Sequence, residues 1–257
     1  VGNTELKVEH LNVTDDAGVH RVKDVNFEVH SGEIVGIAGV SGNGQSELMD
    51  VITGIKPLQK GQIQIKNETI TPALSTDAAT MRRFGMGHVP EDRQRRGLVT
   101  SFSANENIIL GYHKDPAYNR FLEMDRDAIV QSCTEQMEHF DVRPSNPFLR
   151  TTLFSGGNQQ KLVVAREMER DPNLLVVGQP TRGVDIGAIE FIHRQIIAMR
   201  DAGKAVLLIS VELDEILSLS DRILVMFDGQ IMGEVMAKDA NERDIGLLMA
   251  GVQKEMA

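Results

Sequence analysis

Hydrophobic and polar positions alternate along several segments near the start of the chain. Residues 5–13 and 20–30 alternate with a period of two, and residues 61–66 repeat the pattern. A period of two places apolar side chains on one face of a β-strand, so each segment is predicted to be a strand with one solvated face. The apolar run at 34–38 instead predicts that residues 33–38 form a strand that is buried on both faces.

The pattern changes in the middle of the chain. Residues 77–84 have helical spacing and residues 85–90 have strand spacing. From residue 103 to about residue 170 the helical period dominates, with Pro and Gly turns near 114–120 and 143–157. This long helical stretch predicts a lobe inserted between two parts of a core that contains a sheet.

Short apolar runs return in the last third of the chain. They lie at 174–177, 205–209 and 223–227, and they alternate with helical patterns at 185–202 and 212–219. Apolar runs that alternate with helices are typical of parallel strands buried between layers of helices. The sequence therefore predicts that a parallel part of a sheet is completed here.

The end of the chain predicts one hairpin and one helix. Asp228-Gly229 is a turn signal that leads into a strand at 231–236, and a final helix is expected from Asn241 to about Ala250. The predicted fold class is α/β, with a mixed core sheet, an antiparallel β subdomain and an inserted helical subdomain. We expect one domain over 1–257, with the core at about 1–90 and 171–257 and the helical lobe at about 91–170.

Composition narrows the functional classes. Of 257 residues, 41% are hydrophobic and 25% are charged, which is typical of an ordered globular chain. The net charge of −10 and the pI of about 5.2 argue against a broad nucleic-acid footprint, which needs clustered Lys and Arg. Cys133 is the single cysteine, so no internal disulfide can form. No apolar run approaches the length that spans a bilayer, so membrane association is expected through a partner.

The first candidate site is the glycine loop that follows the strand predicted at 33–38. The spacing G-x-x-x-x-G-K-[ST] is kept by Gly39, Gly44 and Ser46, but Gln45 stands in place of the lysine. A strand before such a loop and a helix after it favour a phosphate-binding loop, and a glycine turn that serves packing is the alternative. The residues expected to contact nucleotide are Gly39, Ser41, Gly42, Asn43, Gly44, Gln45, Ser46 and Glu47.

The second candidate site is a loop at 155–159, which reads Ser155, Gly156, Gly157, Asn158 and Gln159. It opens a helix that is expected to run to about residue 170. The free N–H groups and the partial positive charge of a helix N-terminus bind anions without a lysine. The alternative is a glycine turn in which the serine only caps the helix.

With both loops in view, the chain resembles the ATP-binding cassette (ABC) ATPase family over essentially its whole length, a P-loop NTPase-like fold. The loop at 155–159 is similar to the family's signature loop, residues 39–46 to its Walker A, residues 174–179 to its Walker B and residues 181–185 to its D-loop. The resemblance implies that two cassettes pack head to tail. Each ATP, with Mg²⁺, then lies between the Walker A of one cassette and the signature loop of the other.

Two further stretches narrow the resemblance. Residues 89–93 (Val-Pro-Glu-Asp-Arg) and 179–185 (Gln-Pro-Thr-Arg-Gly-Val-Asp) are similar to those of the sugar and nucleoside importers, and residues 42–45 favour the nucleoside branch. Those importers carry two cassettes in one polypeptide of roughly twice this length, and this chain resembles the second, C-terminal one. The resemblance implies a partner cassette and transmembrane permease subunits at the cytoplasmic face of the cell membrane, with no nucleic acid bound.

The chain departs from the family pattern at catalytic positions. Gln45 replaces the Walker A lysine, Gly178 the Walker B aspartate, Gln179 the general base, Val211 the switch histidine and Glu91 the glutamine near the metal. A positioned base is typically worth about 10²- to 10⁴-fold in rate, and an amide cannot supply it. We therefore expect no catalytic residue in this chain's own Walker site, which should bind ATP weakly or not at all.

The complementary half is kept. Ser155, Gly156 and Gly157 are present to close over an ATP held by a partner, and Asp185 is placed as the D-loop residue, with a plain helix cap as the alternative. Ser46 could still reach Mg²⁺ through its hydroxyl, as a weak ligand. Two competing hypotheses are an active soluble ATPase with compensated motifs and a non-transport ABC protein that acts on ribosomes or DNA.

Overall fold

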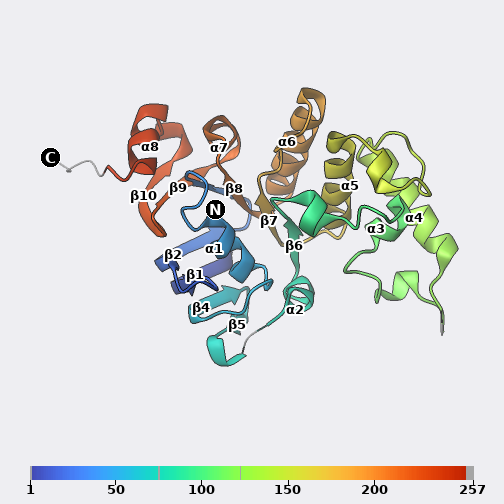
Figure 1. The fold of residues 1–257 in the computed structure, drawn as a ribbon, viewed down its shortest axis with the longest axis horizontal. Helices are drawn as coiled ribbons and strands as arrows, with labels where there is room; N and C mark the ends of the chain where they lie inside the picture. Colours follow the sequence, from blue (N-terminus) through green and yellow to red (C-terminus); the bar gives the residue numbers. More distant parts are fainter. Residues whose placement is uncertain (1, 75, 122, 253–257) are drawn as a thin grey trace. The chain divides into compact units, whose positions relative to one another are not determined.

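The computed structural model describes residues 2–74, 76–121 and 123–252, shown as a ribbon in Figure 1. Their contacts divide the chain into two compact units. Unit 1 holds the described residues up to His88, Pro172–Gln179 and the described residues from Gln195 onward, and unit 2 holds Val89–Asp171 and Pro180–Arg194. None of the described helices is both long and apolar enough to cross a bilayer.

A four-stranded antiparallel sheet forms one part of unit 1. Its strand order is β2-β1-β4-β5, with the bounds Thr4–Thr14 (β1), His20–His30 (β2), Lys60–Ile65 (β4) and Glu68–Ile70 (β5). Leu6 pairs with Ile65 and Val8 with Phe27, so apolar residues meet on the same face of the sheet. These side chains are buried, which confirms the predicted alternation.

A six-stranded mixed sheet forms the other part. Its order is β10-β9-β3-β8-β7-β6. The bounds are Ile34–Ala38 (β3), Met86–Val89 (β6), Leu174–Gly178 (β7), Ala205–Ser210 (β8), Arg222–Phe227 (β9) and Gln230–Met236 (β10). Strand β3 runs parallel to both β8 and β9, and β7 runs parallel to β8. β10 returns antiparallel to β9 after the turn at Asp228-Gly229, as predicted.

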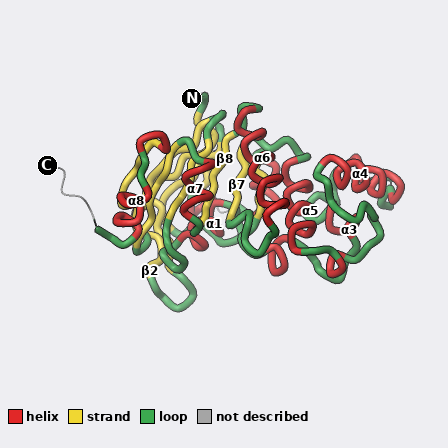
Figure 2. Tube along the Cα trace, turned by 90° about the horizontal axis from the view of Figure 1, so that it is seen from above, coloured by secondary structure: helices red, strands yellow, loops and turns green. Residues whose placement is uncertain are grey.

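One apolar core holds unit 1 together. It includes Leu6 of β1, Ile37 of β3 and Leu48 of α1, so both sheets and α1 contribute to the same buried cluster. Figure 2 shows the strands of this unit in yellow, with helices among and beside them. The helices of unit 1 are α1 (Gln45–Ile52), α2 (Ala78–Arg83), α7 (Leu213–Leu219) and α8 (Glu242–Met249), together with the short turns Pro72–Leu74 (η1) and Ala237–Asp239 (η5).

Unit 2 is built mainly from helices. They are α3 (Ala104–Ile108), α4 (Arg126–His139), α5 (Gly156–Met168) and the first part of α6 (Ile186–Asp201), with short turns at Arg93–Gly97 (η2), Pro116–Tyr118 (η3) and Thr151–Leu153 (η4). Helices α3, α4 and α5 contact one another. The ring of Phe140 packs edge-on against Phe191 of α6, and the ammonium of Lys161 lies 4.6 Å from the same ring.

The sheets and the helical unit confirm the predicted α/β class with a mixed sheet, an antiparallel β subdomain and an inserted helical part. The observed boundaries of the helices and strands differ from the predicted ones by one or two residues. Helix α1 begins at Gln45, inside the glycine motif, although the pattern predicted a start at Glu47. Residues 180–194 belong to unit 2, so this unit extends beyond the stretch of about 91–170 that the helical period marks.

Candidate functional site

The glycine loop connects β3 to α1 within unit 1. Gly42 and Gly44 have φ angles of 90° and 101°, in the left-handed region that side chains other than glycine adopt only with strain. A Cβ on Gly44 would collide with the carbonyl oxygen of Arg21 and would lie 3.0 Å from Cε of Met226. Glycine is therefore required here both by the backbone conformation and by the close approach of β2.

Gln45 turns its amide back into the loop. Its side chain is only 4% exposed, and a Cβ on Gly39 would collide with its Nε2 atom. Within the described residues, Nε2 has no hydrogen-bond partner. A buried donor without a partner costs about 1–3 kcal/mol, and a phosphate oxygen could accept a hydrogen bond from it. The loop therefore fits a phosphate in shape and in donors, but this position carries no positive charge.

Asn43 ties the tip of the loop to the β9–β10 hairpin. Its side-chain Oδ1 accepts a hydrogen bond from the N–H of Asp228 at 3.3 Å, and its backbone carbonyl accepts one from the N–H of Gly229 at 3.0 Å. Among the described residues its Nδ2 is a second buried donor without a partner. The loop is thus held in place by protein contacts and still offers two neutral amide donors.

The same site lacks the acidic partner that Mg²⁺ would need. Ser46 is exposed in the first turn of α1, followed by Glu47. At the end of β7, where the family has an aspartate, Gly178 offers no side chain. In the described parts of the chain, no group of three or more His, Cys, Asp or Glu residues could hold a metal ion. Among the residues predicted for this site, the Ser46 hydroxyl is a group that could ligate Mg²⁺, and Gly178 supplies no carboxylate.

Gln179 spans the ends of β7 and β8. Its φ angle is 47°, its N–H donates to the carbonyl of Ile209 at 2.8 Å, and its Oε1 accepts from the N–H of Val211 at 3.5 Å. The residue at the general-base position therefore bonds to the backbone at the switch position. An amide oxygen has no basicity with which to take a proton from water. The structure therefore brings Gln179 and the backbone of Val211 together at the ends of β7 and β8.

The signature loop opens α5 in unit 2. The hydroxyl of Ser155 accepts hydrogen bonds from the N–H and the Nδ2 of Asn158, at 3.4 and 2.9 Å. The Oδ1 of Asn158 in turn accepts from the N–H of Arg143 at 2.7 Å. Gln159 is buried and donates to the carbonyl of Thr151 at 2.9 Å. Ser155 is thus an N-cap, as the alternative held, and it is also exposed at a helix N-terminus that suits an anion.

The D-loop lies against the signature loop. Asp185 caps α6 by accepting from the N–H of Ala188 at 3.0 Å, so the alternative of a helix cap is confirmed as one of its roles. A Cβ on Gly157 would press on the Asp185 carboxylate and would lie 2.9 Å from the Cβ of Ala188. Beside these loops Leu153 and Ile186 are 67% and 77% exposed.

The charged loop after β6 contributes a residue that the sequence did not place in the site. The Asp92 carboxylate accepts two backbone N–H bonds at 3.1 Å and so starts the turn η2. Arg93 in this turn donates to the carbonyls of Arg182 and Gly183, at 2.6 and 3.1 Å. Burial lowers the pKa of Arg93, but an arginine stays protonated at neutral pH. Glu91, just before the turn, lies half-buried in unit 2.

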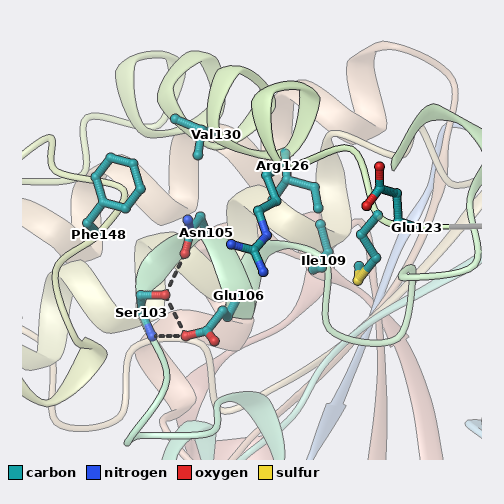
Figure 3. Close-up of a pocket in the computed structure, with 10 residues that line it drawn as sticks. Ser103, Asn105, Glu106, Ile109, Glu123, Arg126, Val130 and Phe148 are labelled. Atoms are coloured by element: carbon teal, nitrogen blue, oxygen red, sulfur yellow. Dashed lines mark hydrogen bonds between the residues drawn. The ribbon is translucent and has the colours of Figure 1, made fainter. Parts of the chain in front are cut away.

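A groove of about 620 Å³ lies between α3 and α4 of unit 2 (Figure 3). Along its rim Phe148 and Met124 are 68% and 40% exposed. The polar groups at its base are engaged in capping α3, because the N–H and the hydroxyl of Ser103 donate to the Glu106 carboxylate at 2.8 and 2.6 Å. These bonds hold the pKa of Glu106 below its usual range. The groove is therefore of mixed character, since Glu123 and Arg126 line it together with apolar side chains (Figure 3).

Comparisons with known proteins agree with this geometry. A family model described as "ABC transporter" matches residues 22–182. The chain is 45% identical over 246 residues to a protein of Lactococcus lactis named "Nucleoside import ATP-binding protein NupA", covering 96% of this chain and 48% of that protein. It is 44% identical over 259 residues to the "Guanosine import ATP-binding protein NupO" of Bacillus subtilis, covering 99% and 49%. The chain thus spans about half the length of these curated relatives.

More distant similarities extend to a sugar importer and to solved structures. The chain is 40% identical to the "Glucose import ATP-binding protein TsgD13" of Haloferax volcanii, covering 97% of this chain and 45% of that protein. A crystal structure of a nucleotide-free ATP-binding cassette superposes with a TM-score of 0.77 at 22% identity, over 96% of this chain and 95% of the other. The structure of a dimeric bacterial ABC transporter cassette superposes with a TM-score of 0.75 at 22% identity, over 90% of this chain and 98% of the other. These structures confirm the cassette fold.

Proposed function

Because the chain belongs to the ABC transporter family as an ATP-binding cassette, we propose that it is the degenerate cassette of an importer of nucleosides or simple sugars. Its signature loop completes the ATP site of a partner cassette, and its own Walker site neither hydrolyses ATP nor binds it tightly. The observation that carries this proposal is the contrast between the two half-sites. The signature loop and D-loop keep their anion-binding and capping groups, whereas Gln45, Gly178 and Gln179 lack the charge and the base.

The weakness of the Walker site rests on the kind of donor that it offers. Gln45 and Asn43 present neutral amides, and a charge-assisted hydrogen bond is about twice as strong as a neutral one. Ser46 is the remaining Mg²⁺ ligand, because Gly178 supplies no carboxylate. When ATP and Mg²⁺ are bound in the assembled importer, this site would hold phosphate through the loop N–H groups and the two amides. Hydrolysis is assigned to the partner's site.

The partners follow from the relatives and from chain length. Since the chain spans about half of each nucleoside-import relative, the partner cassette is proposed to lie in the same polypeptide, with this chain as the second, C-terminal cassette. The similarity of residues 89–93 and 179–185 to that position in importers supports this order. Permease subunits would hold the pair at the cytoplasmic face of the membrane. We propose the groove with Phe148 and Met124 on its rim as the permease contact, because these apolar side chains are exposed there.

The cargo is proposed to be a nucleoside. Both relatives at 44–45% identity are named for nucleoside or guanosine import, whereas the glucose-import relative is 40% identical. The loop at residues 42–45 favours the same branch. Other subunits would select the cargo, so its identity is tested by uptake assays in the assembled importer.

A calorimetric titration with Mg-ATP tests the Walker half of this proposal. For the original chain we expect a dissociation constant above about 1 mM, because Gln45 does not supply the positive charge that a lysine would place on the phosphates. Gln45→Lys restores that charge in the same loop, and we expect it to regain measurable affinity. Micromolar binding by the original chain would contradict a weak site, and turnover measured on the same sample would identify an active ATPase instead.

A further inference from the structure

One guanidinium joins three loops of unit 2. Arg93 donates to the carbonyls of Arg182 and Gly183, which are consecutive in the D-loop turn, at 2.6 and 3.1 Å. A Cβ on Gly156 would lie 2.7 Å from Nη2 of Arg93 and 2.9 Å from the carbonyl oxygen of Gly183. The guanidinium and the D-loop turn therefore both pack directly against the backbone of the signature loop.

The segment that carries Arg93 is held at two further points. Nε2 of Gln94 donates to Oε1 of Gln159 in α5 at 3.3 Å. At the other end of the turn, the buried Arg166 of α5 donates to the carbonyl of Gly97 at 2.7 Å. The charged loop is thus fastened at both ends to the helix that the signature loop opens. Arg93 lies between these points and is aimed at the D-loop.

The D-loop turn offers carbonyls that an arginine matches in shape. Gly183 has a φ angle of 65°, and the N–H of Val184 closes the turn on the carbonyl of Thr181 at 3.2 Å. The planar fork of a guanidinium can bond two adjacent carbonyl oxygens, whereas a lysine ammonium is a point charge on a flexible stem. The two bonds therefore fix the direction of the turn as well as its position.

We propose that Arg93 is a positioning residue that holds the D-loop turn against the signature loop, so that Ser155 and Asp185 meet a partner cassette as one preformed surface. The functional part of this inference rests on the proposed function, in which the signature loop completes a partner's ATP site. A preformed surface avoids the cost of ordering loops when the partner binds. The positive charge of Arg93 beside the N-terminus of α5 also favours an anion there.

Hydrogen exchange of the full chain tests the positioning directly. The variants are Arg93→Ala, Arg93→Lys, which keeps the charge but not the fork, and Arg95→Ala as the control. Arg95 lies in the same turn, but its side chain is 87% exposed, and its Nε atom lies 3.7 Å from a carboxylate oxygen of Asp92. We expect amides at 181–185 and 155–158 to exchange at least about tenfold faster in Arg93→Ala and severalfold faster in Arg93→Lys. Equal exchange in all three variants overturns the inference, and Arg93→Lys decides it if the alanine variant does not fold.

ATP hydrolysis by the assembled importer separates this inference from the proposed function. We expect Arg93→Ala to lower kcat about tenfold with a melting temperature like that of Arg95→Ala, and Arg93→Lys to recover part of the rate. Ser155→Asp, which keeps the helix cap, tests the signature loop itself. If Ser155→Asp abolishes hydrolysis and Arg93→Ala does not lower it, the inference is overturned. If exchange rises in Arg93→Ala but Ser155→Asp leaves hydrolysis intact, the positioning holds and the proposed function fails.

Discussion

At the scale of single residues, two glutamines stand at the positions where we propose that the charge and the base of the Walker site are absent. Gln45 is 4% exposed and packs its amide against Gly39, and Gln179 accepts a hydrogen bond from the backbone of Val211. The amide of Gln179 is thus bonded to the backbone, whereas Nε2 of Gln45 is buried in the loop without a hydrogen-bond partner among the described residues. A return to lysine or glutamate would restore charge, but the new side chain would also have to leave the contacts that the amide now makes.

Cys133 gives a residue-scale prediction that reports on the packing of unit 2. The thiol is fully buried in α4, and burial raises its pKa to about 12. The thiolate is the reactive form, so at pH 8 only about one thiol in 10⁴ is ionised. We expect a disulfide reagent to label the native chain over hours and the guanidinium-unfolded chain within seconds. Complete labelling of the native chain on mixing would show that α4 does not bury this side chain.

At the scale of elements, an ion pair connects β9 to the start of β3. Arg222 donates from Nε and Nη2 to the two carboxylate oxygens of Glu33, at 2.8 and 3.0 Å, and Glu33 is 6% exposed. Burial acts to raise the pKa of Glu33, but the hydrogen bonds from Arg222 and His30 outweigh it and set the pKa below its ordinary 4.5. The stabilisation is therefore present above pH 4.5 and is lost as the pH falls through the lower folded-state value.

Glu33→Gln tests this pair. We expect the free energy of unfolding at pH 7 to fall by about 3 kcal/mol, because the largely buried Arg222 loses its two-bond carboxylate partner and keeps the half-exposed Glu234 as its remaining acidic partner. The difference from the original chain should shrink towards acid pH. Glu234→Gln is the matched control, since Glu234 bonds the same arginine at 3.0 Å from a half-exposed side chain and should cost less than about 1 kcal/mol. Denaturant unfolding at several pH values measures the free energy of unfolding of both variants. An equal loss of this free energy in the two variants would contradict this account.

Element patterns were predictable to the extent that a local period encoded them. Apolar alternation marked β1, β2 and β4, and continuous apolar runs marked β3, β7 and β8, because sheet burial imposes those periods directly. The start of α1 at Gln45 was missed, because glycine spacing defines the motif without fixing where helical dihedrals begin. The extension of unit 2 into residues 180–194 was also missed, since it depends on contacts between segments distant in the chain.

In the candidate site, too, some residues were predictable from the sequence and one was not. The glycine loop, the signature loop and Asp185 were named from motif spacing, and their backbone geometry suits the roles expected of them. Arg93 could not be assigned from sequence, because an arginine in a charged loop is usually solvated. Its partners are carbonyls about ninety positions away, and a carbonyl carries no side-chain signal.

At the scale of the whole molecule, the two half-sites lie in different units. Unit 1 holds the glycine loop and the altered Walker B and switch positions, whereas unit 2 holds the signature loop, the D-loop and Arg93. The groups that suit anion binding and capping are in unit 2, and the departures at Gln45, Gly178 and Gln179 are in unit 1, whereas the departure at Glu91 lies in unit 2. We propose that this division lets unit 2 complete the ATP site of a partner while the altered positions leave this chain's own site weak.

The most direct test of the asymmetry is ATP hydrolysis by the assembled importer carrying one charge-matched substitution in each half-site. Ser155→Asp and Ser46→Asp each place a carboxylate at an exposed helix start that tolerates it, so both variants should fold. We predict that Ser155→Asp lowers the rate at least about tenfold, because it repels the partner's bound phosphate, and that Ser46→Asp changes it less than about twofold. A rate abolished by Ser46→Asp and kept by Ser155→Asp would contradict the account.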